Sequence, residues 1–153
     1  MAKNELENIG KEFARAITQA MLGSAKMELV DAISTYDNIE ASFLPKVSEH
    51  PDLALELKRR IGERKFLLFC ERNRPLEEVS LYYQAIRKLG FTDLEKKATV
   101  EMIFARYCLR NGHLKRGEKL LRKLLPELNN NFELYSHLKQ KTEEILKLIE
   151  KAK

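Results

Sequence analysis

The chain has 153 residues and a net charge of +5, with 44% hydrophobic and 33% charged residues, a balance typical of one folded domain and not of a disordered chain. No stretch approaches the roughly 18 consecutive apolar residues of a membrane span, and the N-terminus lacks the apolar core of a signal peptide. The two cysteines, Cys70 and Cys108, lack metal-site spacing, so we expect reduced core residues in a cytoplasmic protein.

Apolar residues recur at helical spacing through nearly the whole chain, and Gly and Pro mark the breaks between the periodic segments. The pattern predicts an all-α fold of about seven helices, over residues 4–22, 25–43, 52–73, 75–90, 92–111, 114–125 and 132–151. The connections are short, which predicts that neighbouring helices run antiparallel.

Several helix ends carry local signals. Ser24 is a predicted N-cap for the second helix, and Pro75 suits the first turn of the fourth. The segment Thr92–Glu95 fits a capping box that opens the fifth helix. Gly112 is a predicted left-handed stop for that helix, and Pro126 is expected to end the sixth.

The last predicted helix has one apolar stripe and a charged outer face. The stripe consists of Phe132, Tyr135, Leu138, Ile145 and Ile149. A helix with this pattern suits the end of a stack, where only one face is covered.

A seven-residue motif occurs twice, at residues 70–76 and 108–114. With the chain shifted by 38 residues, six positions between 61 and 91 are identical; the pairs are Glu63/Glu101, Phe66/Phe104, Cys70/Cys108, Arg72/Arg110, Asn73/Asn111 and Leu76/Leu114. Phe and Cys four residues apart lie on one helix face, Arg-Asn ends that helix, and Leu begins the next. Each copy is therefore a predicted helical hairpin, and this period is typical of stacked repeats. We call this feature the 38-residue repeat.

The second copy resembles a tetratricopeptide repeat. Large Phe104 precedes small Ala105, the turn glycine Gly112 follows, and small Gly117 begins the second helix; large apolar residues then follow at Leu121 and Leu124. The first copy departs from this pattern at Leu67, Arg74 and Val79, and neither copy has the closing proline.

The resemblance covers about residues 60–129 and implies a right-handed stack of hairpins. The single helical domain would then comprise an acidic N-terminal hairpin (1–50), two repeat-like hairpins (52–129) and a capping helix (130–153).

In such repeats the first helix of each hairpin lines a concave groove. The resemblance therefore implies a partner-binding groove lined by Arg64, Leu68, Arg72, Met102, Arg106 and Arg110. Guanidinium groups bind carboxylates through two parallel hydrogen bonds, so the implied ligand is an acidic peptide or a C-terminal carboxylate, with Leu68 and Met102 providing apolar contact. For Arg72 and Arg110 the preferred interpretation is simpler: each interacts with the C-terminal carbonyls of its own helix.

The charge of the chain is unevenly distributed. Residues 1–57 carry five Lys or Arg against ten Asp or Glu, residues 58–123 carry eighteen against eight, and residues 124–153 carry five of each. The basic middle is either a surface for an acidic partner or a set of solvated helix faces. Docking of the acidic first third onto it, within one molecule or in a homodimer, is a further alternative.

Nucleic-acid binding is the alternative function. The basic residues that would follow a phosphate backbone are Lys58, Arg59, Arg60, Lys115, Arg116, Lys119, Arg122 and Lys123. No aromatic interleaving or RNA-binding motif accompanies them, and a solvated helix face is the preferred interpretation.

Catalysis has little support in the sequence. His50, His113 and His137 are scattered, and no phosphate-binding loop, nucleophile elbow or paired carboxylate set is present. We therefore predict a non-enzymatic protein-interaction adaptor that needs no cofactor or metal and binds an acidic segment of a partner protein.

Overall fold

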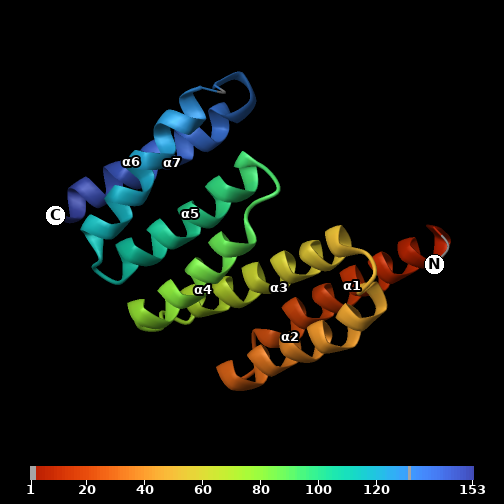
Figure 1. Ribbon diagram of the computed structural model, residues 1–153. Coiled ribbons are helices and arrows are strands. Elements are labelled where there is room, and N and C mark those ends of the chain that lie inside the picture. The colour runs from red at the N-terminus through yellow and green to blue at the C-terminus, as the bar shows by residue number, and fades with distance from the viewer. Residues whose placement is uncertain (1–2, 131) are drawn as a thin grey trace. The chain divides into compact units, whose positions relative to one another are not determined.

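The computed structural model describes residues 3–130 and 132–153, apart from the side chains of residues 132–134 (Figure 1). The predicted all-α fold is confirmed, because the described residues form helices and no strand. The helices are α1 (Lys3–Ser24), α2 (Leu29–Phe43), the 3-10 helix η1 (Leu44–Val47), α3 (Pro51–Glu71), α4 (Leu76–Leu89), α5 (Leu94–Arg110), α6 (Leu114–Asn129) and α7 (Phe132–Ala152). Within the described residues, none of these helices combines the length and the apolar character that crossing a membrane requires.

The chain divides into two compact units, residues 1–68 and 69–153. The first unit contains α1, α2, η1 and most of α3 around one hydrophobic cluster. Phe13 of α1 meets Phe43 of α2 edge to face, with ring centroids 5.5 Å apart, and the guanidinium of Arg60 lies 5.2 Å from the Phe13 ring centroid. These contacts join α1, α2 and α3.

The second unit is built around α5, which packs against both α6 and α7. Its apolar cluster includes Leu121, Leu124 and Leu128 from α6 and Ile149 from α7. Gly117 permits this close packing. A Cβ atom placed there would lie 3.2 Å from Cys108 Cβ and 3.3 Å from Ile149 Cδ1, which is tighter than ordinary contact.

The two copies of the 38-residue repeat contact each other through their turns. Asn111 donates from Nδ2 to Asn73 Oδ1 at 3.1 Å, and Arg110 donates from Nη2 to the Cys70 carbonyl at 3.0 Å. Asn73 has a φ of 50°, a left-handed conformation that Asn adopts more readily than most residues. The preferred interpretation of Arg110 is wrong. Its guanidinium donates to a carbonyl at the end of α3 and not to one at the end of its own helix, α5.

Both cysteines of the repeat are free and buried, as predicted. Burial raises the pKa of the Cys70 thiol to about 12 and that of Cys108 to about 11. The thiolate is the reactive form, so both residues act as core side chains at neutral pH.

Three helix ends differ from the prediction. Ser24 belongs to the last turn of α1, where its hydroxyl donates to the Met21 carbonyl, and α2 starts later, at Leu29. The N-cap of α5 is Asp93, whose carboxylate accepts from the Lys96 backbone N–H at 2.8 Å. The predicted capping box from Thr92 to Glu95 is therefore wrong, because the cap lies one residue later and Lys96 occupies the third helical position.

The third difference concerns α6, which continues past Pro126 to Asn129. A proline inside a helix removes one backbone hydrogen bond. Complete burial of Leu128 beyond it offsets that loss. The predicted stop at Gly112 is confirmed, with α5 ending at Arg110 and a φ of 80° at the glycine.

In α7, Leu138, Ile145 and Ile149 of the predicted apolar stripe are buried and Tyr135 is half-buried. The Phe132 side chain lies outside the described residues.

Candidate functional site

A cavity of about 340 Å³ lies among α4, α5 and α6 in the second unit. Its volume falls within the range of small-ligand sites. The lining is dominated by charge, with five cationic and two acidic residues; the lining residues are Tyr83, Gln84, Arg87, Lys97, Glu101, Arg116, Lys119, Leu120, Lys123 and Glu127. We call this feature the basic cavity.

Two buried aromatic rings lie against the two arginines of the basic cavity. Tyr83 of α4 and Phe104 of α5 are buried, and their ring centroids lie 4.7 Å apart. The guanidinium of Arg87 lies 5.8 Å from the Tyr83 ring centroid, and that of Arg116 lies 5.7 Å from the Phe104 ring centroid. Both arginines therefore rest on neighbouring rings, which restricts the positions of their guanidinium groups.

One buried carboxyl group faces the basic cavity. Glu101 is only 6% exposed, and its Oε1 accepts a hydrogen bond from the Tyr83 hydroxyl at 3.2 Å. Burial raises the pKa of Glu101, while the charge of Lys97 and the Tyr83 hydrogen bond act in the opposite direction. Burial likewise raises the pKa of the Tyr83 hydroxyl, so this group remains a donor.

The cations of the basic cavity fall into two groups. Lys97 donates to both carboxylate oxygens of Glu127, at 2.8 and 2.9 Å, and its charge is thereby compensated. Within the part of the chain that the structure describes, the other four cations form no ion pair with a carboxylate; they are Arg87, Arg116, Lys119 and Lys123. These four side chains are exposed to solvent and available to an anion.

Helical spacing explains why α6 supplies three of these cations. Arg116, Lys119 and Lys123 lie three and seven residues apart along one face of the helix. Leu121 and Leu124 occupy the opposite face and are buried in the cluster of the second unit. Burial of the leucines therefore turns the cations outward, toward the basic cavity.

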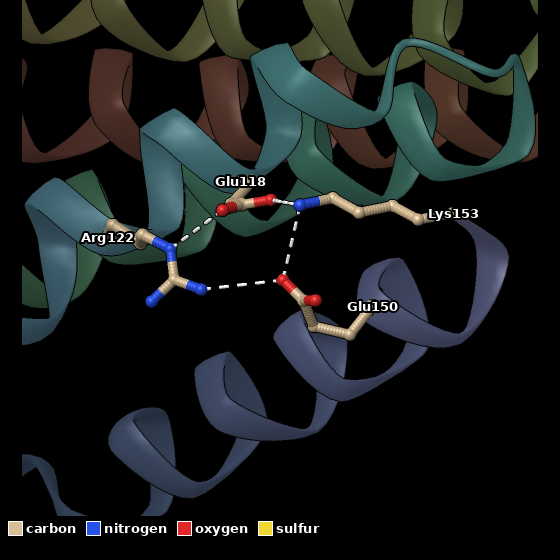
Figure 2. Close-up of polar contacts among 4 residues, drawn as sticks. All are labelled: Glu118, Arg122, Glu150 and Lys153. Carbon is tan, nitrogen blue, oxygen red and sulfur yellow. Dashed lines mark hydrogen bonds and ion pairs between the residues drawn. The ribbon is translucent and has the colours of Figure 1, made fainter.

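Arg122 of the predicted basic face has a different role. Figure 2 shows it in a network that joins α6 to α7 and the C-terminal residue. Glu118 accepts from Arg122 Nε at 2.9 Å and from Lys153 Nζ, while Glu150 accepts from Arg122 Nη2 at 3.4 Å and from Lys153 Nζ at 3.3 Å. The charge of Arg122 is compensated within the fold. Lys115 lies outside the basic cavity and lines a second, more open hollow together with His113 and Lys153.

The residues of the implied groove fall in both units. In the first unit, Arg64 is half-buried and Leu68 is buried in the core; in the second, Met102 is buried, Arg106 is exposed and Arg72 is half-buried. The expected apolar contact through Leu68 and Met102 is wrong, since both side chains are 6% exposed or less and are packed in hydrophobic clusters. Arg110 is engaged with Cys70 and Asn73.

The other predicted basic residues lie in the first unit. Lys58 is exposed, Arg59 is half-buried, and Arg60 stacks on Phe13.

Arg87, Lys97 and the Tyr83–Glu101 pair were not predicted as site residues from the sequence. Glu101 had one usable signal, because it is an acidic position of the 38-residue repeat that falls among apolar neighbours on α5. For Arg87 and Lys97 no signal was available, since nothing in the local sequence shows which helices surround them.

No protein family, curated protein or solved structure matches the chain. Within the described residues, no group of three or more His, Cys, Asp or Glu side chains is placed to hold a metal ion.

The buried carboxyl group predicts a pH dependence of stability. The pKa of Glu101 is higher in the folded than in the unfolded protein, so its contribution to folding is fully present below the unfolded pKa and is lost as the pH rises through the folded pKa. Glu101→Gln keeps an acceptor for Tyr83 but cannot ionise. We expect the variant to unfold at higher urea concentration than the parent at pH 8 and at the same concentration near pH 4, as measured by circular dichroism. An equal difference at both pH values would contradict this.

Proposed function

We propose that the chain is a TPR-like, helical-repeat interaction module that binds an acidic segment of a partner protein in the basic cavity. The observation that carries the proposal is the convergence of four uncompensated cations, from α4 and α6, on one preformed concavity. The contacts between the turns of the 38-residue repeat support a stack of hairpins, because equivalent positions of the two copies meet directly.

The chemistry of the cavity suits carboxylates. Guanidinium groups present planar pairs of donors that match a carboxylate, and ammonium groups add charge without a fixed geometry. Arg87 and Arg116 are restrained by the rings beneath them, so less conformational entropy is lost when an anion binds.

Because these cations are exposed to solvent, binding of an acidic segment should depend on the salt concentration. Solvent-exposed charges interact over about a Debye length, so the proposal predicts affinity that falls as salt rises from about 0.05 to 0.5 M.

The double substitution Arg87→Glu and Arg116→Glu tests the site. We expect it to weaken binding of a fluorescein-labelled peptide rich in Glu and Asp by about thirtyfold or more, because like charges then face the ligand. Fluorescence anisotropy measures the affinity, and circular dichroism should show unchanged helix content, since both residues are exposed.

The matched control is Lys88→Glu with Lys147→Glu, which changes the net charge equally at exposed positions outside the cavity lining. We expect the control to retain most of the affinity. An equal loss in both variants would show that net charge alone attracts the peptide, and full retention by the cavity variant would exclude the basic cavity as the binding site.

A further inference from the structure

The charge of the basic cavity exceeds what a single carboxylate can balance. Five cationic and two acidic residues line it, which gives a net charge of +3 even with both carboxyl groups ionised. Lys97 and Glu127 compensate each other. An anion of charge −1 would leave most of the remaining positive charge without a partner.

The cations approach from two sides. Arg87 belongs to α4, whereas Arg116, Lys119 and Lys123 belong to α6. The rings of Tyr83 and Phe104 are in contact with each other. The guanidinium groups of Arg87 and Arg116, which lie over these rings, therefore rest on neighbouring side chains. A tetrahedral anion with three acceptor oxygens can accept from both helices at once, whereas a planar carboxylate has only two oxygens.

The size of the basic cavity also fits a group larger than a carboxylate. A volume of about 340 Å³ accommodates a phosphoryl group together with the side chain that bears it.

We propose that the basic cavity binds the phosphoryl group of a phosphorylated serine or threonine within the acidic partner segment, with Arg87 and Arg116 as the bidentate donors and Lys119 and Lys123 as supporting charges. The inference rests on the function proposed above. A phosphate monoester carries a charge of about −1.5 to −2 at neutral pH, which matches the cavity better than any single side chain.

Three short peptides test the inference by fluorescence anisotropy with the full chain. They share two flanking glutamates on each side and differ only in the central residue, which is phosphoserine, glutamate or serine. At pH 7.5 we expect phosphoserine to bind about tenfold more tightly than glutamate. The advantage should shrink at pH 5.5, below the second phosphate pKa of about 6.

Arg116→Lys separates geometry from charge. The variant keeps the cation but loses the planar pair of donors, so the preference for phosphoserine over glutamate should fall severalfold while binding of the glutamate peptide changes little. Arg106→Lys, an exposed position on α5 outside the cavity lining, is the control and should leave the preference unchanged.

Two competitors identify the source of the phosphate. Inorganic phosphate at millimolar concentration should displace the phosphoserine peptide, whereas a single-stranded RNA of similar charge should not bind more tightly than that peptide. Failure of inorganic phosphate to compete would overturn the inference, because the flanking residues would then hold the peptide. Tighter binding of the RNA would overturn both proposals.

The remaining outcomes separate the two proposals. Equal binding of the phosphoserine and glutamate peptides would overturn the phosphoryl inference and leave the acidic-segment function standing. Binding of none of the peptides at low salt would overturn the function itself.

Discussion

Replacing Phe104 with alanine is expected to lower the free energy of unfolding by about 3–5 kcal/mol. Phe104 is fully buried, and its ring lies 4.7 Å from that of Tyr83 and 6.1 Å from that of Tyr107, measured between centroids. Truncation leaves a cavity and removes both aromatic contacts. Urea unfolding followed by circular dichroism measures the loss.

The control for this substitution is Leu81→Ala on α4, where the parent side chain is 71% exposed. We expect that change to stay within about 0.5 kcal/mol of the parent. A loss below about 1 kcal/mol for Phe104→Ala would show that the surrounding helices collapse into the vacated space, contrary to the close packing of α5 against its neighbours.

Phe104→Leu tests whether the buried Phe104 ring positions Arg116 in the basic cavity. The substitution retains most of the buried volume but removes the ring beneath Arg116. We expect it to be much milder than Phe104→Ala in stability and still to weaken binding of the acidic peptide severalfold, because the guanidinium loses its support. Unchanged peptide affinity would show that the ring does not position Arg116.

The second large effect is expected at Gly117. Gly117→Val should destabilise the protein by about 1–3 kcal/mol, although valine forms helices better than glycine does. A Cβ atom there already lies 3.2 Å from Cys108 Cβ and 3.4 Å from the Ala105 carbonyl oxygen, and valine adds two methyl groups beyond it. The Cys108 and Ala105 atoms belong to α5 and lie on or next to its backbone, so α6 must move away from α5 to relieve the crowding.

Gly10→Ala is the matched control, because Gly10 also lies inside a helix but has no heavy atom within 4 Å of an added Cβ. There the helical preference of alanine acts alone, and we expect a gain of about 0.5–1 kcal/mol. Thermal unfolding compares both variants with the parent. A gain in stability for Gly117→Val would show that α5 and α6 are not in close contact at this point.

The sequence predicted the helices well because apolar residues recur at helical spacing in each of them. The ends were harder to predict, since they depend on contacts from outside the helix. Pro126 stops a helix in isolation, but burial of Leu128 beyond it keeps α6 continuous. Ser24 resembles a cap for the helix that follows it, yet its hydroxyl completes the helix that precedes it.

The candidate site was only partly predictable. The spacing of Arg116, Lys119 and Lys123 identified a basic face of α6, because residues three, four and seven apart share a helix face. That spacing did not show that α4 lies opposite with Arg87. Met102 was misplaced for a related reason: α5 is covered by both α6 and α7, so residues around much of its circumference are buried.

The contacts between the two turns limit how this protein can be lengthened. Arg110 and Asn111 bind acceptors in the preceding copy of the repeat, where Asn73 has a left-handed conformation. In the later copy the left-handed residue is Gly112 and not Asn111, and the Cys108 carbonyl already accepts from the His113 backbone N–H. A third copy inserted directly after Asn111 would therefore need a turn of the first kind before its own Arg and Asn found the same acceptors.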